Sequence, residues 1–232
     1  MAPENTLLAF REALAVGATH LETDVHASRD GVAVISHDAD LERLTGRAAS
    51  ISSLTMAELA SIQLGRGQSF VSLTEAIDAF PDARFNIDIK SALAVRPTVD
   101  AVLATASTHR VLVTSFSGPR RRAAVRALPG VATSASAAQF AAAFGAAVVG
   151  ATPLARWLLR DVHAVQVPER RYGVRIVSSR LVRALHAAGQ EVHVWTVNDE
   201  GDMNRLLDLG IDGLVTDRAD LAMRVLAQRA TG

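Results

Sequence analysis

Short runs rich in apolar and β-branched residues alternate along this chain with longer segments in which apolar positions recur at helical spacing. Alternation of this kind predicts a parallel β-sheet covered by helices. Strands are predicted at residues 20–25, 32–36, 85–90, 111–116, 131–134, 162–167, 192–197 and 212–216, and helices at 3–17, 72–80, 95–107, 117–128, 178–188, 199–209 and 220–230, with an alanine-rich helical region after residue 134.

The first two predicted strands differ from the others in their connection. Only residues 27–31 separate them, whereas parallel neighbours need a crossover of about a dozen residues or more. Asp30 and Gly31 form a pair that is typical of a tight turn, so we predict an antiparallel hairpin. The following residues, 38–67, are polar and irregular apart from one short helix expected at 55–62, and we interpret them as an insertion.

The number of strands points to a particular α/β architecture. Without the second strand of the hairpin, we count seven strands that are each followed by a helix, and a closed TIM barrel needs eight. Because the chain opens on a helix, the economical interpretation is a TIM (β/α)8 barrel with a small insertion whose first strand is missing from this sequence. No change in composition marks a second domain, so a single domain over residues 1–232 is expected.

Composition excludes several classes of function. The 232 residues carry 24 basic and 24 acidic side chains and no net charge, so a broadly basic nucleic-acid binder is not expected. The absence of cysteine excludes a disulfide scaffold, a thiol nucleophile and a cysteine-ligated metal. The most apolar stretch, residues 140–154, is shorter than the ~20 residues that span a bilayer, and no signal-peptide pattern is present. We expect no transmembrane segment and a soluble cytoplasmic protein.

Charged residues occur two positions apart on two of the predicted strands. Glu22 and Asp24 lie on one strand, Asp88 and Lys90 on another, so the members of each pair point to the same face. In a βα barrel, inward residues at the carboxyl ends of the strands form the active site. Surface ion pairs would explain one such pair, but two pairs of matching parity favour a site. A hard divalent cation with oxygen ligands relieves the repulsion among three confined carboxylates.

Three side chains complete the candidate site. Lys90 is the one lysine among the 24 basic residues, and its compact charge suits a phosphate oxygen next to a metal. His37 closes the hairpin beside the strand of Glu22 and is a candidate general acid or base. Trp195 lies near the carboxyl end of its strand and is expected to form an apolar wall for a substrate.

The other basic and histidine residues are expected to have no part in the chemistry. The run of Arg120, Arg121 and Arg122, with Arg126, is predicted to be a solvated helix face, with an anion site as the less favoured alternative. His26 and the remaining histidines show no partner in the sequence and are interpreted as structural or surface residues.

Seven motifs occur in an order and spacing that resemble a known family. They are Pro-Glu-Asn-Thr-Leu-Leu-Ala-Phe from Pro3, Leu-Glu-Thr-Asp-Val-His from Leu21, Arg-Asp-Gly-Val from Arg29, Ser-His-Asp from Ser36, Asn-Ile-Asp-Ile-Lys from Asn86, Val-Trp-Thr-Val-Asn from Val194 and Asp-Gly-Leu-Val-Thr-Asp from Asp212. Together they resemble the glycerophosphodiester phosphodiesterase family over residues 3–221. The resemblance implies a TIM barrel, a divalent cation (Ca²⁺ or Mg²⁺) and hydrolysis of glycerophosphodiesters to glycerol 3-phosphate and an alcohol.

The resemblance also implies roles by position. Cation ligands would be Glu22, Asp24 and Asp88; Lys90 would contact the phosphate, His37 would be one of two catalytic histidines, and Trp195 would line the site. Asp88 stands where the family usually has Glu, and its shorter side chain bears on cation affinity and preference. By resemblance, the second catalytic histidine belongs to a His-Arg-Gly motif on the family's first strand, which this sequence lacks.

Two explanations for that absence are open: a misassigned start or fragment, which we favour because the other site residues are intact, and a genuine truncation with weak or no activity. Alternative functions on the same barrel are a phospholipase C-like or sphingomyelinase D-like phosphodiesterase, and a non-catalytic module that binds phosphodiesters. The sequence leaves open the headgroup, the native cation and the oligomeric state.

Overall fold

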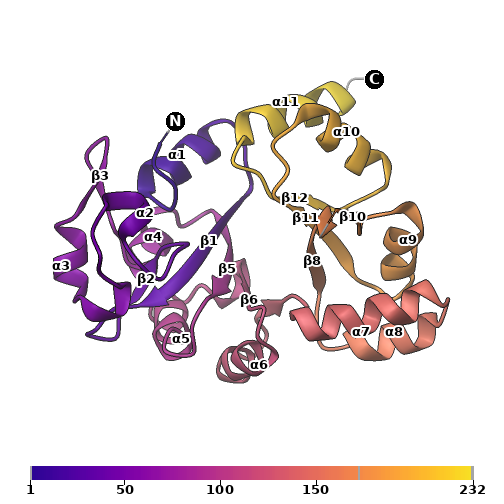
Figure 1. The fold of residues 1–232 in the computed structure, drawn as a ribbon, viewed down its shortest axis with the longest axis horizontal. Coiled ribbons are helices and arrows are strands. Elements are labelled where there is room, and N and C mark those ends of the chain that lie inside the picture. Colours follow the sequence, from indigo (N-terminus) through magenta and orange to yellow (C-terminus); the bar gives the residue numbers. More distant parts are fainter. Residues whose placement is uncertain (1, 172, 231–232) are drawn as a thin grey trace. The chain divides into compact units, whose positions relative to one another are not determined.

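The computed structural model describes residues 2–171 and 173–230 of the chain. The chain divides into two compact units, with the boundary between Ala132 and Thr133, and each unit has a hydrophobic core of its own (Figure 1). The single domain expected from the sequence stays a prediction.

The first unit contains four of the predicted strands, four of the predicted helices and the whole of the insertion. Its elements are α1 (Leu7–Ala15), β1 (His20–Ala27), β2 (Ala33–Ile35), α2 (Glu42–Thr45), the 3-10 helix η1 (Ile51–Ser53), α3 (Met56–Ala60), β3 (Gln63–Gly65), β4 (Gln68–Ser69), α4 (Leu73–Ala79), β5 (Arg84–Ile89), α5 (Val95–Ala104), the 3-10 helix η2 (Thr108–Arg110), β6 (Val111–Thr114) and α6 (Gly118–Ala127), and β7 (Ala132–Thr133) contains the boundary.

The second unit continues the alternation of strands and helices. Its elements are α7 (Ala137–Val148), α8 (Thr152–Leu159), β8 (Ala164–Pro168), β9 (Arg170–Arg171), β10 (Val174–Arg175), α9 (Ser179–Ala187), β11 (Glu191–Trp195), α10 (Glu200–Asp208), β12 (Gly213–Leu214) and α11 (Ala219–Ala230). The predicted alanine-rich helical region is therefore two helices, α7 and α8.

The sheet of the first unit confirms both the hairpin and the parallel strands. Its hydrogen-bonded order is β2-β1-β5-β6-β7. Strand β2 is antiparallel to β1, whereas β5 is parallel to both β1 and β6. Gly31 lies in the hairpin turn with φ of +79°, a left-handed conformation that glycine adopts without steric cost.

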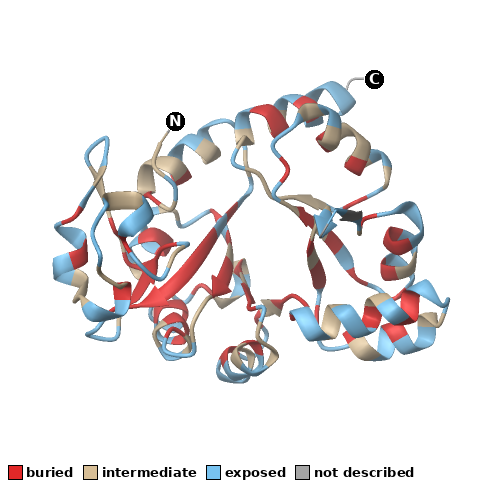
Figure 2. Cartoon of the chain, in the orientation of Figure 1, coloured by how far each residue is buried: buried red, intermediate tan, exposed pale blue. Residues whose placement is uncertain are grey.

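The two faces of this sheet differ in chemistry, as the alternation of residues predicts. Leu21 and Val25 of β1 and Phe85, Ile87 and Ile89 of β5 are buried in one hydrophobic cluster. Residues on the opposite face include the charged pairs of β1 and β5, because side chains alternate along a strand. In Figure 2 these two strands are almost entirely buried.

The insertion is more ordered than the sequence predicts. The short helix expected at 55–62 is observed as α3, but α2, η1 and an antiparallel β3/β4 pair are also present. These elements share a small core with β2, formed by Val34, Leu41, Ile51, Leu59, Ile62 and Phe70. The interpretation as an irregular segment was wrong because the apolar residues of this core are far apart in the sequence, and no local period connects them.

Parallel pairing also organises the second unit. Strand β11 lies between β8 and β12 and is parallel to both. The sequence analysis missed the short antiparallel pair β9/β10. Over the part of the chain that the structure describes, no helix is both long and apolar enough to cross a bilayer.

Candidate functional site

The carboxyl ends of β1 and β5 bring the predicted charged residues together. The parallel register places Asp24 opposite Asp88 and Glu22 opposite Asn86. Because laterally paired residues of a sheet point to the same face, the acidic residues of both strands share one surface. Asp24 and Asp88 are buried, each with 5% of its surface exposed, whereas Glu22 is exposed.

Lys90 bridges the two buried aspartates. Its Nζ lies 2.7 Å from Asp24 Oδ1 and 2.8 Å from Asp88 Oδ2. Burial opposes the charge of this ammonium, but Asp88 and Asp24 outweigh it and hold the pKa of Lys90 above its ordinary value. Lys90 is therefore cationic at neutral pH, and its ammonium joins the two aspartates at the ends of β1 and β5.

Asp88 carries an oxygen that the protein leaves without a partner. Its Oδ1 is buried and accepts no hydrogen bond. Burial raises the pKa of Asp88, and Asp24 adds to this effect, while Lys90 and Arg120 oppose it. A buried carboxylate oxygen without a donor is costly, and it is the kind of ligand that a hard divalent cation takes.

The cluster has oxygen ligands that suit a cation, but in the part of the chain that the structure describes too few of them are already placed together to hold one. Asp24 and Asp88 are side by side, and the free Oδ1 of Asp88 fits an oxygen-liganded metal. Among the described residues, however, no three His, Asp or Glu side chains are already placed to hold a metal together. The structure thus places Asp24 and Asp88 side by side, and Glu22 lies two residues before Asp24 on β1, on the same face.

His37 follows β2 on the same side of the molecule as the end of β1. The backbone N–H of its neighbour Ser36 donates to the carbonyl oxygen of Asp24 over 3.0 Å. Nδ1 of His37 donates to Oδ1 of Asp38 over 2.7 Å. Asp38 also accepts from Arg43, which in turn is paired with Glu4. These contacts keep a proton of His37 on Nδ1 and leave Nε2 available to other partners.

His26 is a buried structural residue beside the cluster, in agreement with its interpretation from the sequence. It is 8% exposed, and its Nε2 donates to the backbone oxygen of His37 over 3.3 Å. Burial lowers the pKa of His26, while the hydrogen bond to His37 and the charge of Asp24 oppose this effect.

The run of arginines at the start of α6 is not the uniform solvated face that the sequence predicts. Arg121 is buried with 2% of its surface exposed, and Arg120 is half-buried and donates to the Ile89 carbonyl oxygen over 3.1 Å; only Arg122 and Arg126 are exposed. The start of α6 is tied to the end of β5, because Ser115 and Arg120 both donate to the Ile89 carbonyl oxygen. Beside it, Phe116 lies 5.8 Å from Lys90 Nζ, at cation–π distance.

Trp195 is the last residue of β11 in the second unit. It is half-buried and lies opposite Pro168 of β8 in the parallel register. Its predicted part in substrate binding stays a prediction, as do the roles of the residues in the first unit.

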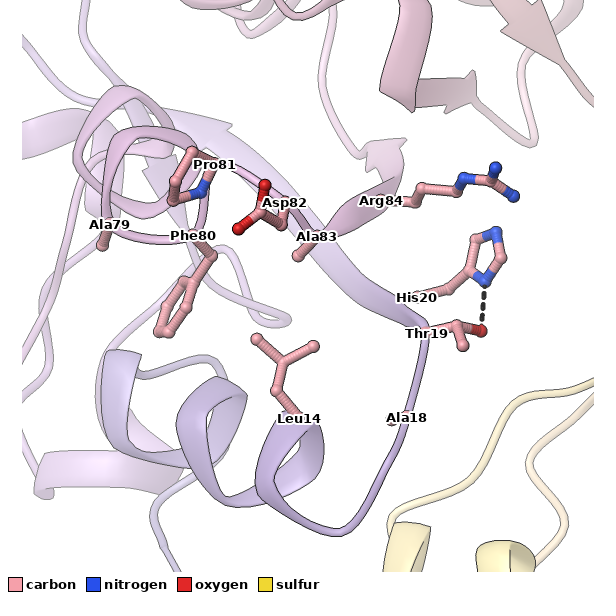
Figure 3. Close-up of a pocket in the computed structure, with 10 residues that line it drawn as sticks. All are labelled: Leu14, Ala18, Thr19, His20, Ala79, Phe80, Pro81, Asp82, Ala83 and Arg84. Carbon is pink, nitrogen blue, oxygen red and sulfur yellow. Dashed lines mark hydrogen bonds between the residues drawn. The ribbon is translucent and has the colours of Figure 1, made fainter.

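A pocket lies at the other end of β1 and β5, away from the charged cluster. It is lined by apolar Leu14 and Phe80 and, where the strands begin, by His20 and Arg84 (Figure 3). His20 Nδ1 is 2.8 Å from the Thr19 hydroxyl. This pocket contains none of the sequence-predicted site residues, and the carboxyl ends of the strands remain the candidate site.

The contacts of Asp38 carry a prediction that involves pH. The hydrogen bond from His37, with help from Arg43, holds the pKa of Asp38 below its ordinary value of 3.8. A carboxyl group with a depressed pKa stabilises the fold above pH 3.8 and loses this contribution as the pH falls through the lower, folded-state pKa. We expect unfolding temperatures of the native chain to fall more steeply below pH 4 than those of Asp38→Asn.

In the same variant, we expect turnover to fall roughly tenfold or more, because the acceptor that orients His37 is removed. Steady-state rates and thermal melts across pH check both parts. The matched control is Asp78→Asn, which changes an exposed aspartate on α4. Equal turnover in Asp38→Asn and Asp78→Asn would show that Asp38 does not orient His37.

The fold and the site together define a class of protein. The chain is an α/β protein whose parallel strands end in buried aspartates, a lysine that joins them, and a histidine in the adjacent turn. Polar groups at the carboxyl ends of parallel strands are typical of βα-barrel enzymes.

Comparisons with known proteins give the family. A family model described as "Glycerophosphoryl diester phosphodiesterase family" matches residues 1–221. The "Probable glycerophosphodiester phosphodiesterase 2" of Mycobacterium tuberculosis is 43% identical over 228 residues, which are 98% of this chain and 86% of the relative. The chain belongs to the glycerophosphoryl diester phosphodiesterase family, a family of phosphoric diester hydrolases.

Solved structures confirm the fold class. A glycerophosphodiester phosphodiesterase from Thermotoga maritima matches with a TM-score of 0.73 and 27% identity, over 97% of this chain and 92% of that one. A phosphodiesterase from Oleispira antarctica in complex with the product sn-glycerol-3-phosphate matches with a TM-score of 0.81 and 23% identity, over 97% and 92%. The fold is thus the α/β fold of the TIM-barrel enzymes of this family, as the sequence predicts.

Proposed function

We propose that this chain hydrolyses glycerophosphodiesters to glycerol 3-phosphate and an alcohol with the help of a divalent cation, Ca²⁺ or Mg²⁺. The observation that carries the proposal is the cluster of Asp24, Asp88 and Lys90 at the carboxyl ends of two parallel strands. The product found in the related Oleispira antarctica structure supports glycerol 3-phosphate as the product here.

The cation would be held by Glu22, Asp24 and Asp88, and the buried Oδ1 of Asp88 is the clearest position for a metal contact. When bound, a divalent cation supplies positive charge to the phosphoryl oxygens and lowers the pKa of a coordinated hydroxyl or water. Asp88 stands where the family usually has the longer Glu. The preference of this chain for Ca²⁺ or Mg²⁺ is therefore to be measured on this chain.

The chain's own side chains bind the phosphodiester and move protons. Lys90 donates to a nonbridging phosphate oxygen and offsets the charge that grows on it in the transition state. His37, held through Nδ1 by Asp38, moves a proton at Nε2, either from the attacking oxygen or to the leaving alkoxide. Trp195 provides an apolar wall for the glycerol or headgroup. A cytoplasmic location also belongs to the proposal and rests on the sequence alone.

The test is hydrolysis by the purified chain with and without a chelator. We expect release of glycerol 3-phosphate from glycerophosphocholine, a loss on the order of a hundredfold or more in EDTA, and recovery when Ca²⁺ or Mg²⁺ is added in excess. Enzymatic assay of glycerol 3-phosphate measures this release.

Other outcomes separate the alternatives. Activity that is unchanged by EDTA removes the cation from the mechanism. Cleavage of lysophosphatidylcholine but not of glycerophosphocholine favours a phospholipase C-like or sphingomyelinase D-like phosphodiesterase activity. Binding of glycerophosphocholine without turnover is the result expected of a non-catalytic module.

A further inference from the structure

Arg120 lies at the edge of the charged cluster although it belongs to a different element. It is in the first turn of α6, after the carboxyl end of β6, and its Nη1 donates to the backbone oxygen of Ile89 over 3.1 Å. Ile89 is the residue between Asp88 and Lys90. The same carbonyl oxygen accepts from the Ser115 hydroxyl over 2.7 Å, so the position of the guanidinium is fixed at the end of β5.

Most donors of this guanidinium are not used by the protein. An arginine side chain offers five N–H groups in a planar fork. Within the described part of the chain, Arg120 uses one of them, toward Ile89, and makes no ion pair. Arg43, by comparison, is paired with both Glu4 and Asp38. A half-buried, anchored arginine with free donors is suited to bind an anion from solution.

The net charge of the site indicates that this anion is the phosphodiester of the substrate. Asp88 feels the positive charge of Arg120, which lowers its pKa against the larger effect of burial. The three acidic residues and Lys90 leave an excess of two negative charges, which a divalent cation would cancel. A phosphodiester then brings one further negative charge, and Arg120 is the cation available to balance it.

We infer that Arg120 binds the phosphate of the substrate beside Lys90, with the free part of its guanidinium on a nonbridging oxygen. The inference rests on the proposed function and adds a substrate-binding residue to it. The rival interpretation is that Arg120 only ties α6 to the end of β5. The two roles of Arg120 affect different quantities. A residue that only ties α6 to β5 changes stability, whereas a residue that binds the phosphate changes the affinity for substrate and product.

The chain offers a matched control on the same helix. Arg122 is exposed and has no hydrogen bond or ion pair among the residues that the structure describes. Arg122→Gln therefore removes the same charge from α6, two residues away, without touching the end of β5. Arg120→Lys retains the charge but loses the fork, so it separates charge balance from the geometry of the contact.

The experiment measures KM and kcat for glycerophosphocholine, calorimetric affinity for sn-glycerol 3-phosphate with Ca²⁺ present, and the thermal midpoint. For Arg120→Gln, we expect KM to rise and product affinity to fall by roughly tenfold to a hundredfold, as for the loss of a hydrogen bond to a charged group. We expect a smaller change in kcat, partial recovery in Arg120→Lys, and values within about twofold of the native chain in Arg122→Gln.

The outcomes distinguish failure of this inference from failure of the proposed function. If KM and product affinity are unchanged in Arg120→Gln, Arg120 does not contact the phosphate, whether or not the thermal midpoint falls. Its role is then only to hold α6 at the end of β5. Equal losses in Arg120→Gln and Arg122→Gln overturn it in favour of a general charge effect. If the native chain neither hydrolyses the diester nor binds the product, the proposed function is wrong and the inference is wrong with it.

Discussion

Replacing Lys90 by methionine is expected to remove nearly all activity and to destabilise the fold. The ammonium is the common partner of Asp24 and Asp88, both buried. Without it, two buried carboxylates face each other, which costs roughly 3 kcal/mol in the free energy of unfolding when one partner of a buried ion pair is lost. Loss of a donor to the phosphoryl oxygen reduces kcat/KM by about 10²–10³-fold. Urea titration and steady-state kinetics measure the two effects.

Arg96→Gln is the control for the loss of a cation that is part of an ion pair. Arg96 pairs with Asp100 over 2.8 Å on an exposed face of α5, where the two side chains are 84% and 51% exposed. Such an exposed pair contributes little to stability, so this variant should keep its stability and its activity. Full activity in Lys90→Met would contradict a phosphate contact, and unchanged stability would contradict the buried bridge.

Replacing His37 by glutamine is expected to reduce turnover by orders of magnitude with little effect on folding. The His37 side chain is 59% exposed and its contact is with the neighbouring Asp38, so few packing interactions depend on the ring. The proposed role is proton transfer at Nε2, and loss of such a group typically reduces the rate by ~10²–10⁴-fold. We expect kcat to fall by that factor while the thermal midpoint stays within about a degree, because exposed substitutions change stability little.

His109→Gln is the matched control for this variant. His109 is also exposed, lies in η2 and has no proposed part in the site. Its replacement should leave kcat unchanged. If His37→Gln keeps more than about a tenth of the native kcat, another group transfers the proton, and the neighbouring His26 becomes the residue to test.

Much of the candidate site follows from the sequence because strand parity is a local property. Glu22 and Asp24, and likewise Asp88 and Lys90, are two residues apart, so each pair had to share a face once the strands were recognised. The apolar residues that alternate with Asp88 and Lys90 then determine which face of the strand packs against helices. The hairpin was equally local, since five residues are too few to connect parallel neighbours.

The residues that the sequence analysis misjudged are those whose environment comes from distant parts of the chain. Arg121 is buried, and Arg120 donates to the carbonyl oxygen of Ile89, which lies 31 residues earlier in the chain. The insertion has a core because Leu41, Ile51 and Phe70 meet in space, and no local pattern encodes such contacts.

The sequence by itself determined the α/β class, the family resemblance and the residue types of the site, because alternation, motif order and charge can be read along a single chain. Only the tertiary structure decided how these charges are arranged. It placed Lys90 between Asp24 and Asp88, left Asp88 Oδ1 without a donor, and brought Arg120 to the end of β5. The physical reason is that burial and pairing depend on which strands become neighbours, and that is fixed by packing of the whole sheet.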